Sequence, residues 1–195
     1  QGFDLRLWPE RLPQPLKWRR SRTIFVNSMS DLFHERVPTE FIAEVFEVMS
    51  DARWHVFQVL TKRPERLVEI SSLLSWPPNV WMGVSIENRR FVSRADFLRE
   101  VPAAVRFISA EPLLGPLEGL DLGDIDWLIA GGESGPGHRP IRKEWVTDLQ
   151  SRCNDAGVAF FFKQWGGPRP KSRGRELDGR TWDEMPARPR AVAPA

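Results

Sequence analysis

The chain has 195 residues and a mass of 22.5 kDa, enough for one domain with a buried core. With 41% apolar and 28% charged residues, neither a disordered chain nor a fibrous repeat is expected. The net charge is only +2, but residues 1–22 carry +4 (six basic, two acidic) and residues 163–195 another +4 (eight basic, four acidic), which leaves −6 between them. No apolar run approaches the roughly 18–20 residues of a membrane span, and no secretory signal is visible, so we expect a cytoplasmic protein without membrane contact.

Composition divides the chain into three segments. Residues 1–22 form a lead-in rich in Pro, Arg and Trp, residues 23–167 alternate apolar runs with amphipathic stretches, and residues 168–195 form a basic tail rich in Pro and Arg. In chain order, the apolar runs predict strands at 23–27, 54–60, 80–86, 105–109, 126–130 and 158–162. Apolar spacings of three and four predict helices after Pro38, after Pro64, from Phe91 to Leu98 and from about Arg142 to Ala156.

Alternating strands and helices indicate an α/β fold, and near-continuous apolar strands indicate parallel pairing buried on both faces. Right-handed crossovers then produce a partial (β/α) barrel of about six strands or, alternatively, an open doubly wound sheet. In either architecture ligands bind at the carboxyl ends of the strands. The polar residues that follow the strands are therefore the candidate site residues: Asn27, Ser28, Asp31, Thr61, Lys62, Arg63, Ser85, Glu87, Asn88, Ser109, Glu111, Glu133, Ser134, Lys163 and Gln164. The alternative is that charges gather there because the chain becomes solvated.

Among these residues we predict Glu111, Glu133 and Lys163 as catalytic. Pro112 biases Glu111 toward an extended conformation, which aims its carboxylate at a ligand amine or hydroxyl, or pairs it with Lys163. The segment Gly131-Gly132-Glu133-Ser134-Gly135 follows a strand, so its amides are candidates for facing a phosphate or carboxylate. A turn that needs small residues explains this segment equally well.

Cysteine and histidine usage limits metal chemistry. Cys153 is the only cysteine, which excludes an internal disulfide and an all-cysteine metal or iron–sulfur site built by this chain alone. It lies among apolar neighbours of a predicted helix, where we expect it to be buried. His34, His55 and His138 lack metal-ligand spacing, and no metal site is predicted.

Nucleic acid is a candidate partner because both termini are basic. Aromatic and basic residues also adjoin each other at 18–20 and 163–165, which suits base stacking and phosphate contact. The alternative is that the termini are solvated basic tails.

Six strand-end segments carry a family resemblance over nearly the whole chain. They are FVNSMSDLF at 25–33, VLTKRP at 59–64, MGVSIEN at 82–88, FISAEPL at 107–113, AGGESG at 130–135 and FKQWG at 162–166, with LDGR at 177–180 after them. Together they resemble an uncharacterised phage and prophage protein family, a domain of unknown function with a three-cysteine motif near the N-terminus. That family in turn resembles the radical S-adenosylmethionine enzymes.

The resemblance implies a partial barrel whose strand ends hold S-adenosylmethionine and a [4Fe–4S] cluster, with Asn27, Ser28, Ser85, Glu87, Glu111 and Glu133 facing the cofactor or substrate. Together with Gly131 and Gly132 of the glycine-rich loop, Asn27, Ser28, Ser85 and Glu87 are the predicted cofactor-binding residues. Because the resembling family occurs in phages and prophages, we also expect the protein to lie in the host-cell cytoplasm and to bind a phage-encoded partner protein.

The cysteine count departs from the resemblance, because one cysteine cannot hold the cluster. The chain begins with Gln1 rather than Met, so we expect a three-cysteine segment upstream of it in the intact protein; the alternative is a form that has lost the segment. Two functions follow: radical chemistry on nucleic acid or nucleotides, or non-catalytic binding of nucleic acid or protein by a vestigial site. A metal-independent hydrolase that uses Glu111 or Glu133 as general base lacks an identifiable nucleophile.

Overall fold

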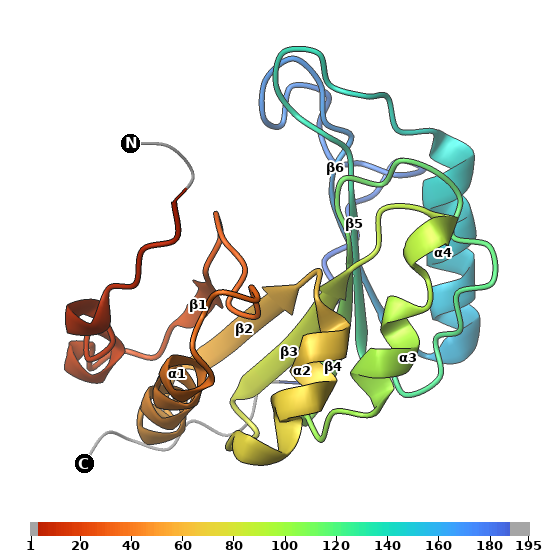
Figure 1. The fold of residues 1–195 in the computed structure, drawn as a ribbon. Helices are drawn as coiled ribbons and strands as arrows, with labels where there is room; N and C mark the ends of the chain where they lie inside the picture. Colours follow the sequence, from red (N-terminus) through yellow and green to blue (C-terminus); the bar gives the residue numbers. More distant parts are fainter. Residues whose placement is uncertain (1–3, 188–195) are drawn as a thin grey trace.

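The computed structural model describes residues 4–187, which form a curled sheet with helices on its outer side (Figure 1). All six strands are parallel and are ordered in space as they are in sequence, β1 to β6. They are β1 (Thr23–Val26), β2 (Val56–Thr61), β3 (Val80–Ser85), β4 (Val105–Ala110), β5 (Trp127–Gly131) and β6 (Ala159–Gln164). Each overlaps the strand predicted from the apolar runs.

Four α-helices connect the strands. They are α1 (Thr39–Asp51), α2 (Pro64–Ile70), α3 (Arg94–Arg99) and α4 (Lys143–Ala156). Short 3-10 turns η1 (Pro9–Arg11), η2 (Pro15–Lys17), η3 (Ser71–Leu73) and η4 (Arg89–Phe91) lie in the lead-in and the connections. Gly157, with φ of 69°, ends α4 in the left-handed conformation that glycine adopts at little cost.

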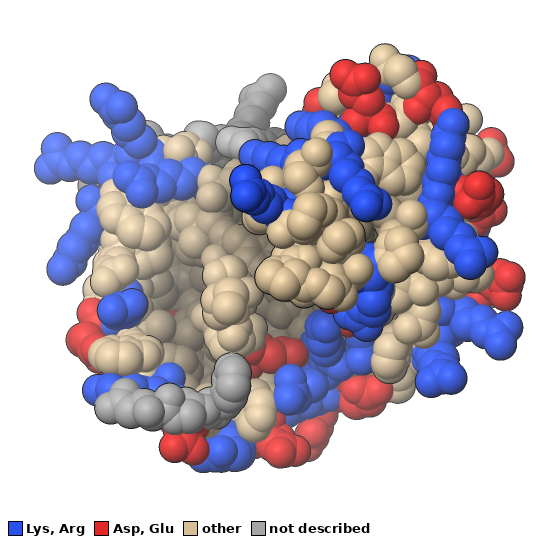
Figure 2. Space-filling model, turned by 90° about the horizontal axis from the view of Figure 1, so that it is seen from above, with Lys and Arg blue, Asp and Glu red and all other residues tan. Residues whose placement is uncertain are grey.

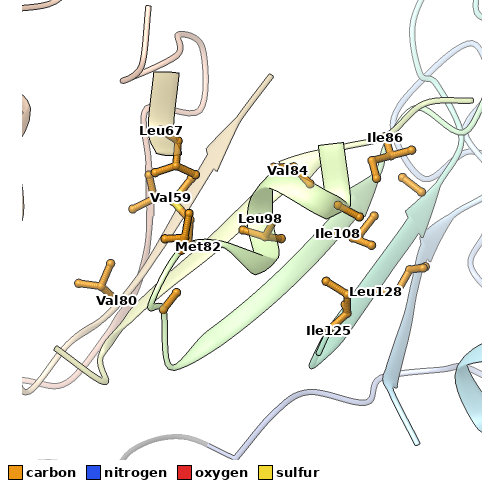
Figure 3. Packing of buried hydrophobic residues seen from close by; sticks show 14 of the residues in the cluster. Val59, Leu67, Val80, Met82, Val84, Ile86, Leu98, Ile108, Ile125 and Leu128 are labelled. Atoms are coloured by element: carbon orange, nitrogen blue, oxygen red, sulfur yellow. The ribbon is translucent and has the colours of Figure 1, made fainter. Parts of the chain in front are cut away.

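The two faces of the sheet have different surroundings. On the convex face, Met82, Val84 and Ile108 pack with Ile42 of α1 and Leu98 of α3 in the main core, part of which Figure 3 shows. Fully burying a side chain of this size stabilises the fold by roughly 1.5–3 kcal/mol. The buried residues of the concave face form a second cluster made only of strand residues: Val56, Trp81, Val105, Phe107, Trp127 and Ile129. With its helices packed on one face, the sheet is a half-barrel, which confirms the partial-barrel prediction over a doubly wound sheet.

The lead-in is tied to the start of β2. The ring of His55, which is fully buried, contacts the carbonyl of Pro15 through Nε2 and accepts the Arg22 amide at Nδ1. The Trp54 indole donates to the carbonyl of Trp18 at 2.7 Å. Residues 1–3 of the lead-in lie outside the described part.

The beginning of the tail covers the outer edge of β6. Phe161 forms an antiparallel bridge with Asp183, and the Phe162 amide donates to the Trp182 carbonyl. The Trp182 ring packs edge-on against Phe160, with 6.0 Å between ring centroids. Residues 188–195 of the predicted tail lie outside the described part. Within residues 4–187, no helix combines the length and apolar character needed to cross a bilayer.

Candidate functional site at the carboxyl edge

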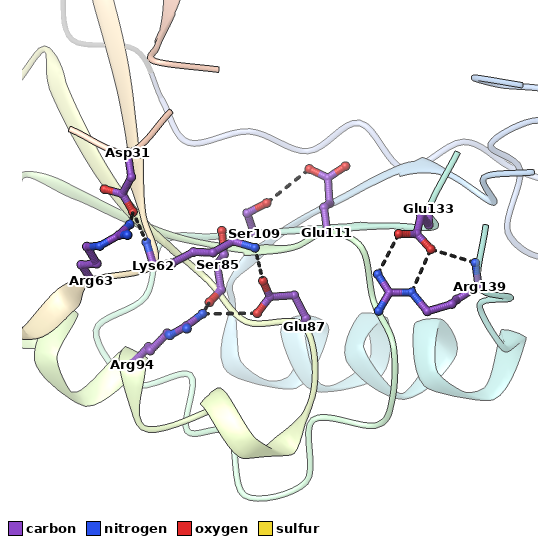
Figure 4. A network of polar contacts seen from close by, with 10 residues as sticks. All are labelled: Asp31, Lys62, Arg63, Ser85, Glu87, Arg94, Ser109, Glu111, Glu133 and Arg139. Atoms are coloured by element: carbon purple, nitrogen blue, oxygen red, sulfur yellow. Dashed lines mark hydrogen bonds and ion pairs between the residues drawn. The ribbon is translucent and has the colours of Figure 1, made fainter. Parts of the chain in front are cut away.

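The parallel sheet brings the predicted polar residues to one edge, drawn in Figure 4. Ser85 of β3 and Ser109 of β4 are direct register partners, and both are almost fully buried. On β5 and β6 the register shifts: Ala130 pairs with Phe162, but Gly131 pairs with Gln164. Lys163 is therefore the extra residue of a bulge, a feature that re-aims side chains at sheet edges.

Glu111 and Lys163 form an ion pair next to this bulge. Their Oε1 and Nζ atoms are 3.1 Å apart, and the side chains are 20% and 58% exposed, respectively. The Ser109 hydroxyl donates to the other carboxylate oxygen at 3.3 Å. A carboxylate that keeps one weakly held oxygen beside a mobile ammonium group suits recognition of a polar ligand.

Gly131 makes room for Glu111. A Cβ atom at Gly131 would lie 2.8 Å from Oε1 of Glu111, closer than real Cβ contacts. The missing side chain of Gly131 thus leaves room for the carboxylate of Glu111, and the predicted contact of Gly131 with a cofactor stays a prediction.

Glu133, the third predicted catalytic residue, is held by Arg139. Two guanidinium hydrogen bonds, of 2.7 and 2.9 Å, and the Arg139 amide at 2.8 Å all reach its carboxylate. The side-chain hydrogen bonds from Arg139, followed by the backbone one, lower the pKa of Glu133 from 4.5 to about 2. Figure 4 shows Glu133 turned toward Arg139 and away from Glu111. Such a carboxylate stays ionised near neutral pH and is poorly suited to proton transfer.

The glycine-rich loop that carries Glu133 packs against the segment after β6. The Gly132 amide donates to the Gln164 carbonyl and the Gly135 amide to the Gly167 carbonyl. A Cβ at Gly132 would lie 2.2 Å from the Trp165 carbonyl oxygen. Small residues are thus needed here for close packing of two loops, and these two amides are occupied by protein acceptors.

Two further carboxylates fix neighbouring connections. Asp31 accepts the Thr61 hydroxyl at 2.7 Å, the Lys62 amide at 2.9 Å and the Arg63 guanidinium at 3.1 Å, which ties the loop after β1 to the end of β2. Glu87, nearly buried, pairs with Lys62 and with Arg94 of α3 on the helical side of the edge. Each of these carboxylates is held by several partners in the protein. We therefore assign both mainly to fixing the connections between elements.

A groove of about 1950 Å³ covers the concave face, opens at this edge and continues past β1 to the lead-in and to α1, where Phe41, Val45 and Met49 line it. Figure 2 looks onto the carboxyl ends of the strands and shows a hollow of mainly tan surface with Lys and Arg side chains on both sides. Among the described residues that line it, eight are basic: Arg6, Arg11, Arg36, Lys62, Arg63, Lys163, Lys171 and Arg175. Three are acidic: Asp4, Asp31 and Glu111. The lining therefore has an excess of five positive charges, two of which, on Lys62 and Arg175, pair with Glu87 and Asp183 just outside it.

The groove contains part of the predicted site. Among the predicted catalytic and cofactor-binding residues, Asn27, Ser28, Ser85, Glu111 and Lys163 line the groove. Glu87, Gly131, Gly132 and Glu133 lie at the same edge outside this lining.

Sequence reasoning missed lining residues on both sides of the groove. Arg6, Trp8 and Arg11 of the lead-in and Lys171 and Arg175 after β6 all line it. The available signal in the lead-in is the alternation of Leu5 and Leu7 with Arg6 and Trp8, which is typical of an extended segment with one buried side.

Cysteine and histidine positions bear on metal binding. Cys153 is buried on α4, and this burial raises its pKa to about 12, the opposite of what a thiolate ligand requires. Within residues 4–187, no group of three or more His, Cys, Asp or Glu residues could hold a metal ion.

Fold and site together define an α/β half-barrel with a basic groove at the carboxyl edge of its sheet. The chain belongs to the family of proteins of unknown function DUF5131, whose model matches residues 2–186. Searches of curated proteins and of solved structures find no match.

Proposed function

We propose that this chain binds a nucleotide-containing ligand in its concave groove and forms the half-barrel of an enzyme that acts on nucleic acid or nucleotides. The observation that carries the proposal is the charge of the lining, where eight Lys and Arg residues face three Asp and Glu residues. Phosphates supply the matching negative charge. Phe25, which is 43% exposed, and Phe161 line the same groove and offer surface against which bases stack.

In this proposal Glu111 and Lys163 are the reacting groups. Lys163 neutralises a phosphate of the ligand, and Glu111 accepts a hydrogen bond or proton from a ligand hydroxyl or amine. Their 3.1 Å pairing keeps both side chains at the groove mouth before a ligand arrives. Glu133, bound to Arg139, holds the adjoining loop and takes no part in proton transfer.

The likeness to radical S-adenosylmethionine enzymes supports radical chemistry as the reaction type. The residues of this chain do not fit a cluster with three thiolate ligands, because Cys153 is the only cysteine and is buried on α4. Cluster ligands would have to come from outside these 195 residues. The roles proposed for Glu111 and Lys163 therefore depend on neither a cluster nor S-adenosylmethionine.

The position of Cys153 favours a second candidate, a non-catalytic module. In that case the groove binds nucleic acid or a phage-encoded partner protein without reaction. Iron analysis of the protein from its natural host, with oxygen excluded, separates the two. About four irons per chain supports the radical enzyme, whereas an iron-free protein that still binds nucleotides supports the module.

Binding itself is tested by calorimetric titration with the thymidine dinucleotide pdTpdT at low salt. We expect saturable binding to the natural protein, weakened about tenfold by Lys163→Gln because one charge-assisted hydrogen bond to phosphate is removed. Glu111→Gln keeps the shape of the side chain and is expected to retain binding. The control is Lys143→Gln on α4, which removes one positive charge outside the groove. The proposal fails if the natural protein does not bind, or if both lysine variants bind equally.

A further inference from the structure

The groove extends beyond the sheet onto the lead-in. In this segment Leu5, Leu7 and Leu12 pack against the main core. Arg6, Trp8 and Arg11 are exposed and line the groove together with these half-buried leucines. The leucines thus fix a short segment, extended before Pro9 and turned into η1 at Pro9–Arg11, and this segment holds a charged and aromatic surface at the groove.

Arg6, Trp8 and Arg11, here called the lead-in cluster, have a defined geometry. The guanidinium carbons of Arg6 and Arg11 lie 4.1 and 4.9 Å from the Trp8 ring centroid, within the range of cation–π attraction. Trp8 is 40% exposed. Because the ring restrains both cations in advance, less side-chain entropy is lost when they meet a phosphate.

A second group of cations lies on the other wall. Lys163, Lys171 and Arg175, the β6 cluster, line the groove at or after the last strand. The guanidinium of Arg175 lies 5.0 Å from the centroid of the Phe161 ring. The lead-in precedes β1, and β1 and β6 are the two edges of the sheet (Figure 1), so the segments that carry the two clusters adjoin opposite edges.

The size of the groove favours a polymer over a single nucleotide. Small-molecule sites typically occupy about 300–1,000 Å³, whereas this groove, which also includes the space between the lead-in and α1, measures about 1950 Å³. Two separated cation clusters also match two separated phosphates. Phe25, which is 43% exposed in the same lining, can stack only on a base whose face is free, as it is in a single strand.

From these observations we infer that a single-stranded nucleic acid crosses the groove from the lead-in cluster to the β6 cluster, and that the lead-in cluster is a second phosphate-binding subsite. This inference rests on the proposed function: the β6 cluster holds the part of the strand nearest Glu111, and the lead-in cluster holds a phosphate further along the same strand.

The test compares a short and a long ligand on the full chain. Dissociation constants are measured for pdTpdT, which is short enough to bind at one cluster, and for a twelve-nucleotide oligothymidylate, chosen to be long enough to reach both. The double variant Arg6→Gln/Arg11→Gln is expected to bind the long strand at least tenfold more weakly and pdTpdT unchanged. Its salt slope for the long strand falls by about 0.7, the value expected when one phosphate of a single strand is no longer neutralised.

Two matched variants accompany the double variant. Arg19→Gln/Arg20→Gln removes two exposed positive charges from the same lead-in but outside the groove lining, and is expected to leave both affinities nearly unchanged. Arg6→Lys/Arg11→Lys keeps the charge and is expected to retain most of the affinity for the long strand. Circular dichroism checks that all variants are folded.

The outcomes are distinct. Absence of binding to either ligand by the natural protein would refute the proposed function and this inference with it. Binding of both ligands, with equal losses in the two glutamine double variants, would refute the lead-in subsite and leave the proposed function standing. Equal affinity for a twelve-base-pair duplex and for the single strand would refute the assignment to a single strand.

Discussion

At the scale of single residues, the position of Glu111 depends on two polar contacts and on the absence of a side chain at a neighbouring glycine. Ser109 and Lys163 contact its carboxylate, and Gly131 leaves the space that the carboxylate occupies. A side chain at Gly131 would collide with Oε1 or push the carboxylate away from the lysine. The neighbouring Gly132 has a different role, because its missing side chain admits the backbone of Trp165.

We predict that Gly131→Ala displaces Glu111 and weakens binding of pdTpdT severalfold. Because the atoms that the new Cβ meets belong to the end of a flexible side chain that can move aside, we expect little loss of unfolding free energy, as measured by urea unfolding. Gly115→Ala is the control, since a Cβ there would meet Asn88 at an ordinary 3.5 Å. Unchanged binding by Gly131→Ala would contradict the proposed role of this glycine.

The ion pair of Glu133 predicts a dependence of stability on pH. The pKa of this group is lowered in the folded state, from 4.5 to about 2, so its stabilising effect is full above pH 4.5 and is lost as the pH falls toward 2. The difference in unfolding free energy between the natural protein and Glu133→Gln should therefore shrink between pH 5 and pH 2. Glu118→Gln, at an exposed carboxylate 3.6 Å from Arg89, is the control. A difference that stays constant over this range would argue against the assigned ion pair.

At the scale of elements, the lead-in keeps its place through a few polar contacts as well as through its leucines. The buried ring of His55 bridges the Pro15 carbonyl and the Arg22 amide, and the Trp54 indole reaches the Trp18 carbonyl. These bonds join the segment to the loop before β2. The wall that carries the lead-in cluster therefore depends on the packing around one histidine.

His55→Phe fills the same space with an aromatic ring but removes both hydrogen bonds. We expect a decrease of about 1–3 kcal/mol in unfolding free energy, because a backbone amide and a carbonyl lose their partner. We also expect faster tryptic cleavage after Arg19 and Arg20, followed by mass spectrometry. His138→Phe, in a loop away from the lead-in, should show neither effect. Unchanged cleavage in His55→Phe would show that the leucines alone hold the segment.

The elements also differ in how well the sequence predicts them. The strands and helices from 23 to 164 were predictable because period and length agree in each, as in α1, where Ile42, Val45, Phe46 and Met49 recur every three or four residues. The gathering of Glu111 and Lys163 at one edge followed from the parallel order alone. The partners of Glu87 and Glu133 did not, since they depend on helix and loop positions that local patterns leave open.

At the scale of the whole molecule, positive charges gather around the groove and negative charges on the helical side. The two basic ends of the chain, each +4, contribute cations to opposite walls of the same groove. The helical side is the more acidic one: α1 carries Glu40, Glu44, Glu47 and Asp51 and no basic residue. In the proposed function, this polarity directs the nucleic acid toward the concave face and away from the helices.

The most direct test of the proposed function is a crystal structure of the protein with pdTpdT at saturating concentration. We expect electron density for the ligand on the concave face, with a phosphate beside Lys163 and a base near Phe25. Density over the convex helices instead, or an empty groove in crystals grown from a solution that shows binding, would contradict it.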